Sequence, residues 1–419
     1  MKAILLLALK SAWARRLTLG IALCAIALAA ALLLAVERVR TDARTSFTQS
    51  VSGVDLVVGA RSGAVPLMLY AVFHAGSATQ NMRWDSFATL AAHPAVDWAV
   101  PLSLGDGHRG FPVLGTTAAY FERLRYGDRQ PLAFAAGKPF ADIFETVLGS
   151  EVAARLGYRV GERITLSHGM AELGPEHGDK PFAVVGILAP TGTPVDRTVH
   201  VGLEAITAIH LDWAGGAPLP GLSIPAEQVK KFDLQPGEIT AMLIGLKSRT
   251  DVFRLQRHIN GWRNEPLLAV LPGVALDELW QTLAMVERLL FAISALVVAV
   301  GLAGLTATLL AGLNERRREL AILRALGAGP RALFLMLTAE GLLVTTLGVL
   351  LGCALLAAGL HFAAPFAQAE FGIQLAWRMF SPNEIALLLS IIVTGLAASL
   401  VPGWRAWRIS LADGLTPRN

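Results

Sequence analysis

The sequence predicts a four-span α-helical membrane protein with an α+β extracytoplasmic domain between the first and second spans. Two observations support this fold class. Of 419 residues, 54% are hydrophobic and only 16% are charged, whereas a soluble globular protein averages about 25% charged residues. Four apolar runs also reach the roughly 20 residues that a helix needs to cross a bilayer core. These runs occupy residues 17–36, 289–313, 332–363 and 384–404.

Residues 1–16, MKAILLLALKSAWARR, are predicted to form an amphipathic helix on the cytoplasmic surface. The basic residues before the first apolar run would also suit a secretory signal peptide. However, the run is about 20 residues long, which exceeds a typical signal-peptide core. Charged Glu37, Arg38 and Arg40 also follow it at once. We therefore expect an uncleaved first span.

Residues 37–288 are numerous enough to form a domain with its own core. Two β-α-β patterns in this stretch indicate a ferredoxin-like unit. They are VDLVVGA (54–60), WDSFATLAAH (84–93) and VDWAVPLSL (96–104), then EITAMLIGLKS (238–248), DVFRLQRHINGW (251–262) and LLAVLPG (267–273). Helical stretches at both ends of the domain would extend the first and second spans outward as stalks.

An inserted second subdomain is predicted between the two β-α-β patterns, at about residues 111–229. This stretch carries its own candidate strands, ERITLSH and FAVVGIL. It also carries candidate helices, TVLGSEVAARLG and GLEAITAIH. The extracytoplasmic domain should therefore consist of a ferredoxin-like host and a guest subdomain.

The distribution of charge predicts the orientation in the membrane. Residues 1–16, 314–331 and the segment after 401 together carry a net charge of +9, whereas residues 37–288 and the outer loop up to Glu384 carry −4. Cytoplasmic segments are enriched in Lys and Arg, so both termini and segment 314–331 are expected in the cytoplasm. The overall charge of +4 then reflects membrane topology, and no nucleic-acid partner is expected.

The sequence contains no common catalytic signature. GxxxxGK[ST], HExxH, GxSxG and CxxC are all missing from it. We therefore expect neither catalytic nor cofactor-binding residues in this chain. His168 and His177 lie nine positions apart in SHGMAELGPEHGDK, but a metal site needs three or four ligands in a fixed geometry. Solvated loop residues are the favoured interpretation and no metal site is predicted; a zinc-binding role is the alternative.

Three residues stand out within the third span. Glu340 lies about nine residues into it, where ionisable residues are costly and usually face the helix bundle. A proton relay is one interpretation, but no second acid or histidine lies deep in the spans. A structural or coupling role is therefore favoured. Gly348 and Gly352 form a GxxxG pair, which permits close helix contact, including contact across a dimer.

The segment between the second and third spans, NERRRELAILRALGAGPR (314–331), is predicted to form an amphipathic helix at the membrane surface. Leucines and one isoleucine share one side, and charged residues share the other. A solvated cytoplasmic loop that merely obeys the charge rule is the alternative. GAGP (327–330) predicts a turn that ends this helix, with Pro330 at the start of the next one.

ERRRELAILRALGA, followed by an apolar helix with AEGLLVTTLGVLLG, resembles the permease motif of the MacB/LolC/FtsX-type (type VII) ABC transporters. The tail PGWRAWRISLADGLTPR is similar to these permeases as well. So are the outer segments VDLVVGARSG, LGSEVAARLGYRVGERITL and FAVVGILAPTGTPVDRTVHV. The resemblance covers nearly the whole chain. A glutamate at the position of Glu340 is typical of the family.

The resemblance implies that segment 314–331 is a coupling helix that docks into a partner ATPase. The residues expected to make this coupling are Glu315, Arg316, Arg317, Arg318, Glu319, Leu320, Leu323, Arg324, Leu326 and Gly327. Because the sequence has no ATPase domain, the nucleotide-binding subunit is expected to be a separate protein. That partner, and not this chain, would bind ATP and Mg²⁺.

The resemblance therefore implies a permease subunit, not itself an enzyme, of a bacterial inner membrane. It would convert ATP hydrolysis into motion of its extracytoplasmic domain. Because the spans lack charged faces, mechanotransmission is favoured over import of a small solute through a pore. The substrate exported or extracted would be hydrophobic, lipid-linked or peptide. The alternatives are a regulator that activates an extracytoplasmic hydrolase without transport, and a membrane sensor or enzyme without an ATPase. Expected partners are the ATPase, a second permease copy or paralogue, an extracytoplasmic adaptor or lipoprotein, and membrane lipid.

Overall fold

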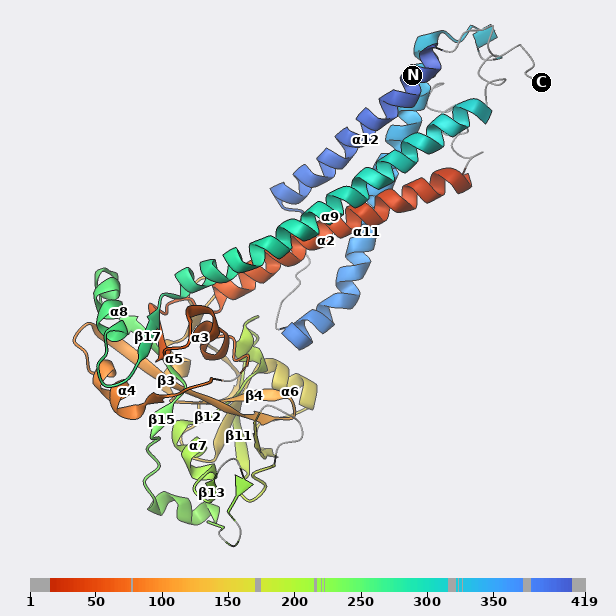
Figure 1. Ribbon diagram of the computed structural model, residues 1–419. Helices are drawn as coiled ribbons and strands as arrows, with labels where there is room; N and C mark the ends of the chain where they lie inside the picture. The colour runs from red at the N-terminus through yellow and green to blue at the C-terminus, as the bar shows by residue number, and fades with distance from the viewer. Residues whose placement is uncertain are drawn as a thin grey trace. The chain divides into compact units, whose positions relative to one another are not determined.

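The computed structural model describes residues 16–76, 78–169, 175–214, 217–219, 221, 223–315, 322, 324–325, 327–371 and 378–408. The chain forms two compact units (Figure 1). One is a helical unit that contains Met1–Asp42 and most of the chain from Leu283 onward. The other is an α/β unit built from Ala43–Thr282. The expectations for residues 1–15 and 409–419 lie outside the described residues.

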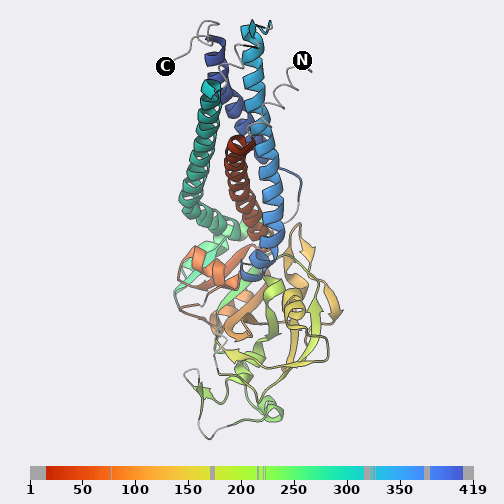
Figure 2. The same ribbon diagram turned by 90° about the vertical axis from the view of Figure 1, so that its right-hand side faces the viewer.

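Within the described part of the chain, four helices are long and apolar enough to cross a membrane. They are α2 (Arg16–Gln49), α9 (Pro272–Glu315), α11 (Pro330–Phe371) and α12 (Pro382–Arg408) (Figure 2). Three of them begin with proline, whose fixed φ and missing N–H suit the first position of a helix. At about 1.5 Å per residue, the 44 residues of α9 extend well beyond the roughly 30 Å hydrocarbon core.

Helix α12 continues through Pro402 and Gly403 to Arg408, although these two residues are typical of a helix end. Pro402 removes the hydrogen bond that its nitrogen would donate to the carbonyl of Ala398. In its place, the Thr306 hydroxyl of α9 lies 3.5 Å from that carbonyl oxygen. Both Pro402 and Gly403 are buried. Packing against neighbouring helices therefore stabilises a helix that its local sequence would interrupt.

The α/β unit contains the remaining helices and strands. Its host part comprises β1 (Leu56–Ala60), α3 (Ala64–Ala71), β2 (Met82–Arg83), α4 (Trp84–Ala91), β3 (Val96–His108), β15 (Glu238–Ile239), β16 (Ala241–Leu246), η3 (Arg249–Asp251), α8 (Val252–Asn260) and β17 (Leu267–Val270). The inserted part comprises β4 (Phe111–Thr116), α5 (Ala119–Arg123), β5 (Arg125–Tyr126), β6 (Gln130–Pro131), β7 (Phe134–Gly137), β8 (Glu145–Leu148), α6 (Ser150–Leu156), β9 (Arg163–Ile164), β10 (Ser167–His168), β11 (Phe182–Leu188), η1 (Pro194–Arg197), β12 (Val199–Gly202), α7 (Leu203–Ile209), β13 (Trp213–Ala214), β14 (Ala217–Pro218) and η2 (Ala226–Lys231).

The host sheet has the order β17-β1-β16-β3, and each pair in it is antiparallel. Numbered along the chain, this is strand order 4-1-3-2, the ferredoxin-like arrangement that the two β-α-β patterns predict. Helices α4 and α8 cover one face, where they pack on Leu56, Val58 and Ile244. Val57 and Leu243 point to the other core, as the alternation of a strand requires. Helix α3, which no periodic pattern in the sequence predicts, contributes to this second core.

The insertion continues the sheet through β3, which has 13 residues and pairs with β16 along its first half and β4 along its second. Beyond β4 follow β12, β8, β11 and β7. The predicted strand ERITLSH is two short strands, β9 and β10, which pair with β11 and β3 respectively. The start of the predicted helix TVLGSEVAARLG belongs to strand β8. A separate core of the insertion includes Val113, Leu148 and Phe182.

Candidate functional site in the membrane helices

The two glycines of the GxxxG pair lie against α2 of the same chain. A Cβ atom added at Gly348 would lie 2.8 Å from Cγ2 of Ile26. One added at Gly352 would lie 2.7 Å from the backbone oxygen of Ala27. Separations this short are tighter than packed atoms adopt, so only glycine permits this approach of α11 to α2. The pair therefore serves helix packing inside the chain.

Helices α11 and α12 pack through a second series of small residues. A Cβ atom at Gly395 would meet the side chain of Thr345, and one at Gly403 would lie 2.8 Å from the Thr338 hydroxyl. Small residues of this kind let two helix backbones approach closely in a membrane, where lipid gives no hydrophobic drive for association. Helix α11 is thus closely packed on both α2 and α12.

Glu340 also lies on α11, and its side chain is completely buried. It lies two residues after Thr338 and directly before Gly341, whose Cβ position is occupied by Ser399 of α12. Burial inside the helical unit agrees with the expectation that an ionisable residue in a span faces its neighbours. Its structural or coupling role remains a prediction.

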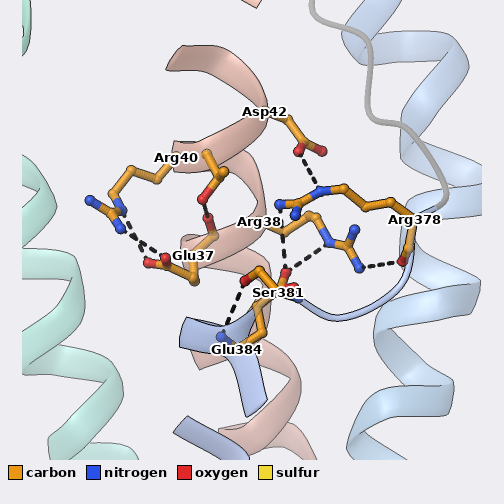
Figure 3. A network of polar contacts seen from close by, with 8 residues as sticks. Glu37, Arg38, Arg40, Asp42, Arg378, Ser381 and Glu384 are labelled. Carbon is orange, nitrogen blue, oxygen red and sulfur yellow. Dashed lines mark hydrogen bonds and ion pairs between the residues drawn. The ribbon is translucent and has the colours of Figure 1, made fainter. Parts of the chain in front are cut away.

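A buried ion pair, not foreseen from the sequence, connects α2 to the start of α12 (Figure 3). Nε of Arg38 lies 2.9 Å from Oε1 of Glu384, and the two side chains are 4% and 0% exposed. Glu384 also caps its own helix: its Oε2 accepts the N–H of Ser381, and the Ser381 hydroxyl accepts the N–H of Glu384. This reciprocal pattern is a capping box. The carboxylate therefore fixes both the start of α12 and its contact with α2.

Arg378, three residues before the capping Ser381, extends the connection. Arg378 donates from Nε to Oδ1 of Asp42 at 3.2 Å, while its carbonyl accepts from Nη2 of Arg38 at 3.1 Å. Figure 3 shows the two guanidinium groups side by side, each directed at a carboxylate from a different helix. The chain between α11 and α12 is thereby bound to α2 by polar groups at two successive turns, Arg38 and Asp42.

These contacts can hold α2, α12 and the chain between α11 and α12 together. Separating them would leave a buried charge without its partner, which is costly. The sequence shows each half of this contact separately. Arg38 lies just after the first predicted span, and SPNE (381–384) is typical of a helix start. The pairing itself joins residues 346 positions apart, so it depends on the tertiary fold.

The predicted coupling segment is described only in part. Of its proposed coupling residues, Arg316, Arg317, Arg318, Glu319, Leu320, Leu323 and Leu326 lie outside the described residues. Glu315 ends α9. The turn predicted at GAGP is confirmed, since Gly327 has φ +101° and α11 begins at Pro330. Only glycine adopts that φ without steric cost.

The structure corrects the interpretation of His177 as a solvated loop residue. Its side chain is completely buried, and its ring packs on Trp213 with centroids 4.0 Å apart. Trp213 comes from a distant part of the chain, and the N–H of His177 also donates to the carbonyl of Leu166 at 2.8 Å. That bond folds the segment back against the strand pair β3 and β10.

Family models match most of the chain. The MacB-like periplasmic core domain matches residues 17–257, and the FtsX-like permease C-terminal model matches residues 291–411. The chain is 22% identical over 424 residues to the lipoprotein-releasing system transmembrane protein LolC of Xylella fastidiosa, covering 90% of this chain and 95% of that one. It is 27% identical over 231 residues to the macrolide export ATP-binding/permease protein MacB of Rhodospirillum rubrum, covering 55% of this chain and 32% of that one.

A solved structure, the periplasmic region of MacB from Actinobacillus actinomycetemcomitans, aligns with 57% of this chain and 97% of that chain, at 12% identity and a TM-score of 0.34. The family models match both parts of the chain in the order that the fold requires. The core-domain model covers α2 and most of the α/β unit, and the permease model covers most of α9 and the helices after it. The chain therefore belongs to the MacB-like periplasmic core domain family, and it is an inner-membrane permease component of the LolC/MacB type of ABC transporter.

Proposed function

We propose that this permease converts ATP hydrolysis by a separate cytoplasmic ATPase into motion of its periplasmic domain. The observation that carries the proposal is the buried pair between Arg38 and Glu384, which binds α2 to the start of α12. The close packing of α11 on α2 through Gly348 and Gly352 supports it as well. Movement applied to α11 or α12 would then displace α2, because sliding α2 alone would separate a buried ion pair.

The continuity of two helices supports the same mechanism. Helix α2 runs without interruption from Arg16 to Gln49, and α9 runs from Pro272 to Glu315. In each of them the boundary between the helical unit and the α/β unit falls within the helix, which continues through it without a break. A helix transmits displacement along its axis with little loss, since each residue is hydrogen-bonded to the next turn. We infer that segment 314–331 receives the movement in the cytoplasm, where both termini also lie.

A hydrophobic or lipid-linked substrate fits a cavity in the described part of the helical unit. The cavity has a volume of about 420 Å³, within the range of small-molecule sites. Leu356, Leu360, Met379 and Phe380 form its apolar lining, and Arg38 and Arg378 lie at its wall. Apolar walls beside two guanidinium groups suit a molecule with hydrocarbon chains and an anionic or carbonyl-bearing head. Movement of the paired arginines would change the shape of this cavity.

The proposed active form is a dimer with a second copy or a paralogue. One chain supplies one coupling segment, whereas ABC ATPases work as pairs, so two permease chains would occupy both ATPase subunits. Such a complex would export or extract its substrate on the periplasmic side. An adaptor or lipoprotein bound to the periplasmic domain is a further proposed partner.

Replacing Arg316, Arg317 and Arg318 with glutamate tests the coupling segment. The tagged chain is purified in mild detergent, and the ATPase subunits that accompany it are quantified by mass spectrometry. We expect the triple variant to lose the ATPase at least tenfold, because three repulsive charges would face the docking surface. The matched control reverses three exposed arginines of the periplasmic domain, Arg254, Arg257 and Arg263, and should retain it.

Retention of the ATPase by the coupling variant would overturn the assignment of this segment. Recovery of no ATPase with the unmodified chain would overturn the proposed function as a whole. If the ATPase binds but an inactive ATPase leaves the cellular phenotype unchanged, neither transport nor regulation driven by ATP describes this protein.

A further inference from the structure

Four metal-ligating side chains converge in the periplasmic domain, far along the chain from the membrane helices. Asp106, His168, His177 and His210 each offer one ligand atom, and these atoms all lie within 4.8 Å of one another. They come from β3, from β10, from the segment between β10 and β11, and from the end of α7 (Figure 1). The proposed function makes no use of them.

The fold builds this cluster from regular elements. Strand β10 pairs antiparallel with β3 in a register that places His168 directly opposite Asp106. Nδ1 of His168 consequently lies 3.4 Å from Oδ1 of Asp106. The backbone hydrogen bond from the N–H of His177 to the carbonyl of Leu166 places His177 beside this strand pair. His210, directly after α7, completes the group, with Nε2 3.6 Å from the same Asp106 oxygen.

A hydrogen bond orients His210 as a ligand. Its Nδ1 lies 2.7 Å from the carbonyl oxygen of Ile206, which can only accept, so Nδ1 carries the proton in the neutral ring. The lone pair of Nε2 therefore faces Asp106 Oδ1 and lies 3.0 Å from Nδ1 of His168. Metal-binding histidines usually donate their other N–H in this way, which fixes the tautomer and the ring orientation.

Two members of the cluster are buried without the partners that such groups need. His177 is completely buried, and among the described residues neither of its ring nitrogens has a hydrogen-bond partner. Oδ1 of Asp106, a residue only 3% exposed, also lacks a hydrogen-bond donor in the described part of the chain. Buried polar groups are nearly always satisfied. One cation at the centre would satisfy the carboxylate and the imidazole together.

The nearby ammonium group cannot serve as that cation. Nζ of Lys180 is fully buried and lies 2.7 Å and 2.9 Å from the two carboxylate oxygens of Asp212. It also donates to Oδ2 of Asp179 at 3.0 Å. Its charge is therefore balanced by its own acidic partners, and the charge of Asp106 remains available for a different cation.

We propose that Asp106, His168, His177 and His210 form a four-ligand zinc site in the periplasmic domain. Three imidazoles and one carboxylate suit Zn²⁺, and four protein ligands complete its tetrahedral shell. Ligand atoms about 2.0–2.1 Å from a tetrahedral zinc lie about 3.3 Å from one another. The three separations of 3.0, 3.4 and 3.6 Å around Asp106, His168 and His210 match that spacing.

The bound ion would join β3, β10 and α7, and Trp213 would close one side of the site. Because no ligand position stays open for substrate or water, the site is structural or sensory in character. Zinc would then be a regulatory or stabilising ligand of the periplasmic domain, independent of whether the chain couples to an ATPase.

Calorimetric titration of the full-length chain in detergent with ZnCl₂ tests the site after metal is removed by a chelator. We expect one equivalent of zinc to bind with a submicromolar Kd. The double variant His168→Ala/His210→Ala should weaken binding at least 100-fold. The matched control, His93→Ala/His258→Ala, removes two histidines whose rings are also adjacent, with centroids 5.5 Å apart, and should bind as the unmodified chain does.

Cobalt substitution and a conservative variant guard against misfolding. Co²⁺ bound to the unmodified chain should show the intense visible absorption of tetrahedral coordination. Asp106→Asn preserves the shape of the side chain but removes its charge, so it should weaken zinc binding at least tenfold and alter the cobalt spectrum. Absence of zinc binding by the unmodified chain would overturn the proposal. The proposal would also be overturned if the Asp106→Asn and His168→Ala/His210→Ala variants bound zinc as tightly as the unmodified chain does.

Discussion

Arg38 and Glu384 form an ion pair in which Nε and Oε1 are 2.9 Å apart and both side chains are almost fully buried. The two residues belong to helices at opposite ends of the chain, α2 and α12. Charges at such a position are costly unless they are paired. The pair therefore makes the correct association of these helices depend on two side chains.

Replacing Arg38 with leucine should strongly destabilise the helical unit. Glu384 would then lose its nearest cation, since Nη2 of Arg378 lies 4.0 Å away. Breaking a buried pair by removing one partner costs about 3–5 kcal/mol. The midpoint of thermal unfolding in detergent should fall accordingly. The double variant Arg38→Leu/Glu384→Leu, which leaves no unpaired charge, should recover part of this loss; an equal or larger loss would contradict the pairing.

Replacing Gly352 with valine should separate α11 from α2. Its Cβ atom would lie 2.7 Å from the backbone oxygen of Ala27 and 2.8 Å from Cβ of Ala30. Overpacking of this kind costs about 1–3 kcal/mol, which should lower the thermal midpoint. Gly359→Val is the control on the same helix, because no described residue outside its own helical turn has an atom within 4 Å of its Cβ position. Equal effects of the two substitutions would show that valine itself, and not the contact with α2, causes the loss.

Replacing Lys180 with methionine should destabilise the periplasmic domain, because Asp212 would keep a buried charge without its cation. The side chains of this pair are 0% and 4% exposed, so the loss should be about 3 kcal/mol. The control is Lys230→Met. Lys230 lies 2.7 Å from Asp142, but both side chains are more than half exposed, and exposed pairs contribute little. Urea unfolding followed by tryptophan fluorescence should separate the two variants.

The periplasmic domain should lose stability as the pH falls from 7 to 5. Burial lowers the pKa of His74 to about 4 and that of His200 to about 3, whereas the unfolded chain takes up protons near 6.5. Unfolding is therefore favoured as the pH falls below 6.5, and each histidine contributes about 2 kcal/mol by pH 5. Asp106 acts in the opposite direction, because burial raises its pKa to about 6.

His74→Asn isolates the contribution of one histidine. Nδ1 of His74 donates to the Thr198 hydroxyl, which itself donates to the carbonyl of Pro194, and an asparagine amide can take over the first of these bonds. Asparagine also tolerates the φ of +50° at this position. The urea midpoint of the variant should depend less on pH than that of the unmodified chain, by about 2 kcal/mol between pH 7 and 5. Parallel pH profiles would contradict this account.

The ferredoxin-like host was predictable because its signals are local. Strands β1, β16 and β17 are short apolar runs, the first half of β3 is largely apolar, and α4 and α8 follow the helical period. Chain order and the usual connections then leave few arrangements of four such strands. Helix α3 was missed, because AVPLMLYA (64–71) is apolar on all sides and shows no helical period.

The polar sites depend on pairings that no local pattern reveals. Asp106 meets His168 only because β10 pairs with β3 across 62 residues. His210 joins them from the end of a different helix. Likewise, the sequence shows Arg38 only as a charged residue at the end of a span. Its partner Glu384 lies near it only in the folded structure, where α12 packs beside α2. The spacing of His168 and His177 alone shows only two candidate ligands, so the sequence favours their interpretation as solvated loop residues.

Strand β3 belongs to both parts of the periplasmic domain, because it pairs with β16 up to Leu102 and with β4 from Ser103 onward. Most guest domains are joined to their hosts by two flexible linkers, which lets them hinge. Here the junction is β3 itself, a single strand that is hydrogen-bonded to β16 in its first half and to β4 in its second. The inserted part therefore cannot move as a rigid body relative to the host part unless backbone hydrogen bonds of the shared sheet break.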